Sequence, residues 1–304
     1  MQEWARRFKK WGIGPMVALA LAACSAPAPP TGPSASVTQP NEAGPAIHIL
    51  AVETFLADIA QQVAGERLTV SALMPQGADP HSYEPAPADI AKVAESNVLI
   101  VNGAGAESFL DELLQNAGGE RLLIEASAGL VSRHAGEEEE VEGPAEADEP
   151  QEHEHEQDPH FWLDPVNVVH YVENIRDGLS KADPAGSTTY AKNAESYIGQ
   201  LKALDAWIKE QVRQVPQANR KLVTNHESFG YFADRYGFQV IGAIVPNVSS
   251  TASPSAQQLA RLVDRVRQSG VKAIFLETGS NSKLAEQLAQ EAGIKVVTEL
   301  YSHS

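Results

Sequence analysis

Histidine is the residue type whose placement in this chain indicates chemistry. Four of the nine histidines stand in loops of unusual local sequence or just after an expected strand: His81, His160, His226 and His303. Imidazole nitrogens suit Zn²⁺, Cu²⁺ and Ni²⁺, and less exclusively Mn²⁺ or Fe²⁺. A set of three or four histidines favours zinc. A single histidine is more often an ordinary surface or capping residue, so the hypothesis of a zinc site depends on the set.

Two of these histidines share a tripeptide. Asp79–His81 and Asp158–His160 both read Asp-Pro-His. Proline restricts the backbone directly before the histidine, which lowers the entropy lost when a metal orders that side chain. Glu277 ends an expected strand, and we expect it to orient a ligating imidazole rather than to bind metal itself. No metal role is expected for three other histidines: His48 inside an expected strand, His134, and His170 in an expected helix.

The segment before the second tripeptide is strongly acidic. Between Glu137 and Asp158 there are 12 Asp and Glu and no Lys or Arg, so the rest of the chain carries only −5 of the net charge of −17. Such a body offers no basic stripe for nucleic acid. Within the acidic loop, His153 and His155 support two hypotheses: weak metal capture with transfer to the main site, or a solvated charge run without a metal role.

Short apolar runs alternate with helix-like segments along the chain. This alternation predicts an α/β fold in two halves, each a parallel-type sheet of about four strands flanked by helices. Strands are expected at 47–52, 68–73, 98–101, 121–124, 222–224, 239–245, 273–276 and 295–298. Helices are expected at 55–64, 88–95, 107–116, 166–179, 229–236, 255–269 and 283–292.

A longer helix is expected between the halves. Apolar residues recur every three or four positions across 185–215, and Pro216 ends the pattern. The apolar stripe keeps its phase across Gly199, which favours one helix over two shorter ones. At 1.5 Å per residue it would run roughly 45 Å and span both halves. Ligands of open α/β sheets bind beyond the carboxyl ends of the strands, and His81, His226 and His303 are expected there, in a cleft between the two lobes.

The N-terminus has the features of a secretory signal. A basic start is followed by the apolar run 11–20 and by Leu21–Cys24. The run is shorter than the ~20 residues of a spanning helix. Leu-Ala-Ala-Cys resembles the bacterial lipobox, which implies that Cys24 is lipidated and anchors the protein to the membrane. The alternative is a secreted protein with an incidental cysteine.

The expected organisation follows. Residues 1–23 form the signal peptide, 24–45 a flexible tether, 46–183 an N-terminal lobe containing the acidic loop 136–157, 184–215 the linker helix and 216–304 a C-terminal lobe.

Four segments in this order resemble the motifs of the bacterial zinc/manganese ABC-transporter solute-binding lipoproteins, the cluster A-I family: 79–89, 158–165, 225–233 and 275–277. The resemblance implies two α/β lobes joined by a rigid helix, with one metal ion between them. The third ligand is typically His in zinc members and Glu in many manganese members, so His226 points to zinc. The family usually has Asp where this sequence has His303, and relatives continue beyond the position of Ser304, so the sequence is a fragment or has a remodelled end.

Together these features predict a monomeric, extracytoplasmic, lipid-anchored protein that captures Zn²⁺ and delivers it to an ABC-transporter permease without catalysing a reaction. The alternatives are a manganese- or iron-specific protein of the same family, a zinc hydrolase, or a surface adhesin. A hydrolase would need an open coordination position and a general base, for which Glu227 could be nominated, but the sequence has no HExxH motif.

Overall fold

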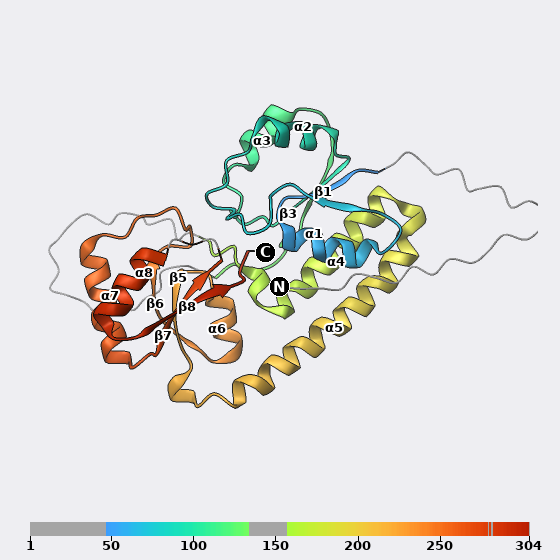
Figure 1. The fold of residues 1–304 in the computed structure, drawn as a ribbon. Helices are drawn as coiled ribbons and strands as arrows, with labels where there is room; N and C mark the ends of the chain where they lie inside the picture. The colour runs from blue at the N-terminus through green and yellow to red at the C-terminus, as the bar shows by residue number, and fades with distance from the viewer. Residues whose placement is uncertain (1–46, 134–156, 279, 281, 304) are drawn as a thin grey trace, which may run out of the picture. The chain divides into compact units, whose positions relative to one another are not determined.

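Two parallel four-stranded sheets form the frame of the protein (Figure 1). The computed structural model describes residues 47–133, 157–278, 280 and 282–303. The chain divides into two units, Met1–Gly44 and Pro45–Ser304, and all described residues lie in the second. Cys24, His134, His153 and His155 lie outside the described residues, so the expectations for the signal peptide, the tether and the acidic loop stay predictions.

The first sheet is covered by helices on both faces. Its strand order is β2-β1-β3-β4, with every pair parallel. The strands are β1 (Ile49–Ala51), β2 (Val70–Ala72), β3 (Val98–Val101) and β4 (Leu122–Glu125). The helices are α1 (Thr54–Ala64), α2 (Pro87–Glu95), α3 (Leu110–Ala117) and α4 (Pro165–Ala182).

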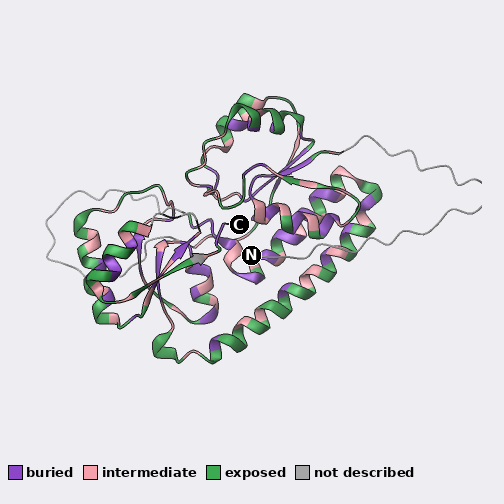
Figure 2. Cartoon of the chain, in the orientation of Figure 1, coloured by how far each residue is buried: buried purple, intermediate pink, exposed green. Residues whose placement is uncertain are grey.

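The two central strands, β1 and β3, are apolar and buried at every position because both faces of the sheet are covered there (Figure 2). The outer strands β2 and β4 are partly exposed and include Ser71 and Glu125. In β3, Val98 and Ile100 point toward α1 and α4, whereas Leu99 and Val101 point toward α2 and α3. This is why the strands were recognisable as continuous Val/Ile/Leu runs.

The second sheet has the matching order β6-β5-β7-β8, again all parallel. Its strands are β5 (Lys221–His226), β6 (Gln239–Val245), β7 (Ala273–Glu277) and β8 (Lys295–Leu300), and its helices are α6 (Gly230–Tyr236), α7 (Ala256–Ser269) and α8 (Ser282–Ala292). Ser255 caps α7 in a reciprocal pair with Gln258, whose N–H donates to the serine hydroxyl oxygen at 3.2 Å. The fold class predicted from the sequence is confirmed.

One long helix, α5 (Ser187–Arg213), connects the two sheets (Figure 1). It packs against α1 and α4 and reaches α6. The helix continues through Gly199, as the phase of its apolar stripe predicted. Its 27 residues correspond to a rise of about 40 Å. A short 3-10 turn, η2 (Pro184–Gly186), comes first, and before it Asp183 accepts hydrogen bonds from Arg67 and Tyr190, each at 2.5 Å.

Several element boundaries differ from the expected ones, and three of the differences have a local cause. His48 precedes β1 instead of lying within a strand, because its N–H donates to the side chain of Asn97 at 2.8 Å. Strand β5 continues beyond Thr224 to His226, since His226 still pairs with Val245 of β6. Helix α3 begins at Leu110 rather than at 107. The reason is that the Glu107 carboxylate accepts hydrogen bonds from the backbone N–H groups of Asn102 and Gly103, in the turn before the helix.

Both sheets have their reversal of strand order at a central pair, β1 and β3 in one and β5 and β7 in the other. The crevice beyond the carboxyl ends at such a point is where open α/β sheets bind ligands. His226 and Glu277 are the last residues of β5 and β7, and Asn102 directly follows β3. Within the described part of the chain, no helix is both long and apolar enough to span a bilayer.

Candidate metal site

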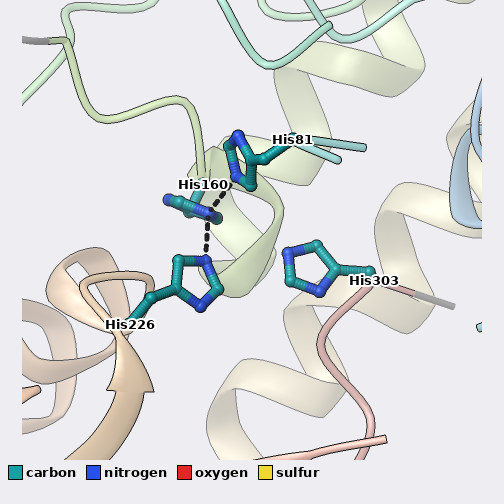
Figure 3. A group of neighbouring side chains, drawn as sticks. All are labelled: His81, His160, His226 and His303. Atoms are coloured by element: carbon teal, nitrogen blue, oxygen red, sulfur yellow. Dashed lines mark hydrogen bonds between the residues drawn. The ribbon is translucent and has the colours of Figure 1, made fainter. Parts of the chain in front are cut away.

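The four histidines selected from the sequence lie together (Figure 3). One ring nitrogen from each falls within 4.8 Å of the others. Nε2 of His160 is 3.2 Å from Nε2 of His81 and 3.1 Å from Nε2 of His226, and the ring of His303 faces them from the remaining side. His81 comes from the loop between β2 and α2, His160 directly precedes the 3-10 turn η1 (Phe161–Leu163), and His303 follows β8.

Two of the separations between the nitrogens, those from His160 to His81 and to His226, suit a tetrahedral cation. Zinc–nitrogen bonds of ~2.0–2.1 Å in a tetrahedron place the donor atoms ~3.3–3.4 Å apart. The measured separations of 3.1 and 3.2 Å are within about 0.3 Å of that value. The donor set is four nitrogens, with no carboxylate oxygen among them. The arrangement can therefore hold one divalent cation of the kind that prefers imidazole.

Asp158 sets the tautomer of His160. Its Oδ1 lies 2.8 Å from Nδ1 of the imidazole, and an ionised Asp158 accepts the Nδ1 proton in that contact. Nε2 is then the nitrogen with a free lone pair, and it points to the centre of the cluster. The Arg133 guanidinium lies 3.5 Å from the other oxygen of Asp158.

The two Asp-Pro-His tripeptides share a local hydrogen bond. The N–H of His81 donates to Asp79 at 2.9 Å, and the N–H of His160 donates to Asp158 at 3.0 Å. Each aspartate thus closes a turn over the proline onto the backbone of its own histidine. Asp79 also accepts a hydrogen bond from Ser250, which follows β6 of the other sheet. The aspartate of each Asp-Pro-His tripeptide therefore has a structural role, in addition to the restriction that the proline places on the backbone.

Glu277 faces two of the histidines. Its Oε1 lies 3.1 Å from Nδ1 of His226, and its Oε2 lies 3.7 Å from Nδ1 of His303. The hydroxyl of Ser228 donates to Oε1 at 3.0 Å. Nε2 of His303 is buried and has no hydrogen-bond partner among the described residues. It is the free donor atom of that ring.

Burial favours the neutral imidazole at three of the four positions, His81, His160 and His303. It lowers the pKa of His81 to about 4, with the charge of His226 adding to the effect. It lowers the pKa of His160 well below its ordinary value and also lowers the pKa of His303. Neutral rings at pH 7 present lone pairs, so a metal ion need not displace protons. Burial opposes ionisation of Glu277, but the contacts with His226, His303 and Ser228 outweigh it and lower the pKa of Glu277.

The cluster is most accessible at His81. Three of the four rings are buried, whereas His81 is partly exposed. It lines a cavity of about 400 Å³ together with Pro159, Gly105 and Ser249. Gln157, the first described residue after the acidic segment, lines the same cavity. Gln157 therefore lies beside the accessible ligand.

Several residues around the cluster were not singled out from the sequence. Asp158 carried a signal in its shared tripeptide. Asn102 and Trp162 carried none, because their partners lie 57 and 140 positions away. His170, given no metal role from the sequence, is on α4 with its ring 3.7 Å from Glu173. Among the described residues it is not part of the metal-binding group.

Comparison with known proteins identifies the family to which the chain belongs. The family described as "Zinc-uptake complex component A periplasmic" (ZnuA) matches residues 49–304. The chain belongs to this family. The expected resemblance to metal-ion ABC-transporter solute-binding proteins is therefore confirmed.

The relatives differ in the metal that they are named for. The manganese-binding lipoprotein MntA of Halalkalibacterium halodurans is 33% identical over 89% of this chain and 84% of its own length. The zinc-binding lipoprotein AdcA of Streptococcus pneumoniae serotype 4 is 35% identical over 80% of this chain, which spans only 48% of AdcA. The iron-binding protein YfeA of Yersinia pestis is 29% identical over 87% of this chain and 80% of its own.

Solved structures share the architecture of this ZnuA-family chain. The periplasmic zinc-binding protein TroA of Treponema pallidum superposes with a TM-score of 0.73 at 26% identity, covering 85% of this chain and 89% of TroA. The manganese-bound periplasmic metal-binding protein of Candidatus Liberibacter asiaticus gives 0.71 at 25% identity, covering 85% and 90%. Membership of the family thus establishes that this is a metal-binding transport protein. It does not establish which metal ion is bound, so that question has to be argued from the residues of the site.

Proposed function

We propose that this protein captures Zn²⁺ with His81, His160, His226 and His303 and delivers it to an ABC-transporter permease. The family supports metal transport through such a permease. The finer parts of the proposal come from the sequence: a monomer, lipid-anchored through Cys24, on the extracytoplasmic side of a bacterial membrane. Several relatives are named as lipoproteins, which supports the anchor.

The set of donor atoms is the observation that favours zinc over manganese or iron as the bound metal. All four groups within 4.8 Å of one another are imidazoles. Imidazole suits zinc, whereas carboxylate, carbonyl and water oxygens suit manganese. Imidazole rings bring no negative charge of their own, so the two nearby carboxylates, Glu277 and Asp158, would balance a divalent cation from just behind the rings.

The number of donors supports binding rather than catalysis. A catalytic zinc has three protein ligands and keeps one position for water, whereas four protein ligands close a tetrahedron. The protein would then bind and release the ion without changing a substrate.

The ion would lie between two lobes. In the proposed domain division, His81 and His160 belong to the lobe 46–183, and His226 and His303 belong to the lobe 216–304, with 184–215 as the linker. Each lobe supplies two ligands, so binding would join them. His153 and His155 of the acidic loop would capture metal weakly and transfer it to the main site.

A metal titration tests the proposal. Purified protein stripped of metal should bind one Zn²⁺ tightly in competition with a chromogenic chelator, and Mn²⁺ much more weakly. His160→Ala should lose this site, and His170→Ala, which removes an exposed histidine of the same half, should keep it. Tighter binding of Mn²⁺ by the wild type would support the manganese alternative, and an unchanged affinity in His160→Ala would refute the site.

Two further measurements test the delivery step and the loop. Zinc-loaded wild type should stimulate the ATPase of its permease in proteoliposomes, and His160→Ala should not. Deleting 136–157 should remove weak additional zinc sites and leave the tight one. Loss of the tight site on that deletion would show that the loop is more than an accessory.

A further inference from the structure

A buried asparagine lies behind His160. Asn102 directly follows β3 and is 0% exposed. Its Nδ2 donates to the carbonyl oxygen of Pro159 at 3.0 Å and to that of Gly103 at 3.0 Å. Its Oδ1 accepts a hydrogen bond from the hydroxyl of Tyr171 on α4. Because the two carbonyls can only accept, they fix which side of the amide carries the nitrogen. All hydrogen-bonding groups of this side chain are used.

The contact with Pro159 acts directly on His160. The Pro159 carbonyl and the His160 N–H are two ends of one peptide group. Asn102 holds the carbonyl oxygen, and Asp158 accepts from the N–H at 3.0 Å and from the ring Nδ1 at 2.8 Å. Hydrogen bonds therefore hold the Pro159–His160 peptide group at both its C=O and its N–H. A further one holds the imidazole ring of His160. This matters because His160 is the ring whose Nε2 approaches both His81 and His226.

Asn102 is itself held by a preformed turn. Its backbone N–H donates to the Glu107 carboxylate at 2.5 Å, and the N–H of Gly103 donates to the other oxygen at 3.2 Å. Gly103, Ala104 and Gly105 have φ of 86°, 52° and 80°. A non-glycine residue in this region costs about 1 kcal/mol or more, so the turn persists only because its surroundings determine it. The two hydrogen bonds to the Glu107 carboxylate stabilise this turn.

We propose that Asn102 is a positioning residue for metal binding, which acts by fixing the Pro159–His160 peptide and so the place of Nε2 of His160. The inference rests on the proposed function of the four histidines. A ligand that must converge with three others tolerates little displacement, because a site needs its donors held to within about 0.5 Å. The Asp158 contact alone fixes the ring relative to its own turn; Asn102 fixes that turn relative to the first sheet.

The chain offers a matched control in Asn174. This residue of α4 also donates from Nδ2 to two loop carbonyls, those of Ala126 at 2.9 Å and Ala128 at 3.0 Å. Neither carbonyl belongs to an Asp-Pro-His tripeptide. Replacing either asparagine by alanine removes the same kind of two-carbonyl contact from the same half of the protein, but only Asn102 contacts the residue before a candidate ligand.

The test compares Asn102→Ala with Asn174→Ala in the full chain. Zn²⁺ affinity is measured by chelator competition, and the ligand field is read from the absorption spectrum of the Co²⁺-loaded protein. Asn102→Ala should weaken Zn²⁺ binding by ~10–100-fold, the range for loss of an outer partner of a ligand, and should alter the Co²⁺ bands. Asn174→Ala should lower the melting temperature and leave both metal readouts unchanged. Equal metal readouts in the two variants would overturn the positioning role.

A second variant covers the case in which Asn102→Ala does not fold. Tyr171→Phe keeps the buried ring and removes only the hydroxyl that orients the Asn102 amide. It should shift affinity and Co²⁺ bands in the same direction by a smaller factor, and wild-type values would contradict the proposal. If wild type itself bound no metal, the proposed function would fail. If wild type bound and both variants matched it, only the role of Asn102 would fail.

Discussion

Trp162 donates a hydrogen bond from its indole Nε1 to the carbonyl oxygen of Ser302, at 2.6 Å. Trp162 lies two residues after His160, and Ser302 directly precedes His303. The indole also stacks on Phe55 of α1, with 4.5 Å between ring centroids. The segment that carries His303 is thus attached to a side chain held by the first sheet's own helix. This attachment gives the fourth histidine a fixed place in the cluster.

Trp162→Phe should therefore weaken metal binding through His303. The phenyl ring preserves most of the stacking on Phe55, and the donor to Ser302 is lost. We expect Zn²⁺ affinity to fall by about 10-fold, the lower end for an outer contact. In a double-mutant cycle with His303→Ala the two losses should not add, because both act on one ligand. Chelator competition measures each corner of the cycle. Trp207→Phe, at a tryptophan of α5 that is 60% exposed, is the control, and fully additive losses would contradict the mechanism.

Glu277→Gln should weaken zinc binding without removing a ligand. The carboxylate faces Nδ1 of both His226 and His303, and glutamine keeps its size while removing the negative charge. A loss of ~10–100-fold is expected in the same chelator assay. Ser228→Ala leaves the carboxylate in place and removes one hydrogen bond to it, so its loss should be smaller. A larger effect of Ser228→Ala would show that the charge is not the cause.

His303→Asp should shift the preference among metals. It replaces a nitrogen donor by a carboxylate oxygen, which suits manganese better than imidazole does. The ratio of Zn²⁺ to Mn²⁺ affinity should fall, even though the absolute affinity for Zn²⁺ also falls. Competition between the two ions, with the bound metal measured after dialysis, gives the ratio directly. An unchanged ratio would mean that His303 is not a ligand.

Much of the fold could be predicted because each element carries a local signal. The residues of β3 are apolar since both faces of the sheet are covered, and α5 keeps one apolar stripe through Gly199. The four histidines were found because Asp-Pro-His occurs twice and because His226 and His303 fall at or after strand ends. Their convergence within 4.8 Å agrees with that reasoning. Metal binding by them stays a prediction.

What could not be predicted depends on partners that are distant in sequence. Asn102 reaches a carbonyl 57 positions away, and Trp162 reaches one 140 positions away. No periodicity or motif encodes such pairs. The start of α3 was misplaced for a related reason: Glu107 is a good helix residue by propensity, but its carboxylate is used by the backbone of Asn102 and Gly103.

A buried acid between β1 and α1 gives a prediction about stability. Glu53 is 1% exposed, and neither of its carboxyl oxygens has a hydrogen-bond partner among the described residues. Burial raises the pKa of Glu53 well above its ordinary value, and the charge of the neighbouring Glu107 raises it further. Burial also raises the pKa of Glu107. The folded protein therefore holds a proton on Glu53 at pH values where an exposed glutamate has lost it.

Glu53→Gln should stabilise the metal-free protein at neutral and alkaline pH. An unfolded glutamate titrates near ~4.3. Between that pH and the raised pKa of Glu53, the folded state keeps a proton that the unfolded state has released. The free energy of unfolding therefore falls as pH rises, by at most ~1.4 kcal/mol per pH unit. Glutamine is neutral at every pH, so the variant does not lose stability in this way as pH rises. Melting temperatures from pH 5 to pH 8 should show Glu53→Gln gaining on wild type as pH rises, whereas Glu66→Gln, at an exposed residue just after α1, should run parallel to wild type. A constant difference across that range would mean that the Glu53 carboxyl does not titrate differently on folding.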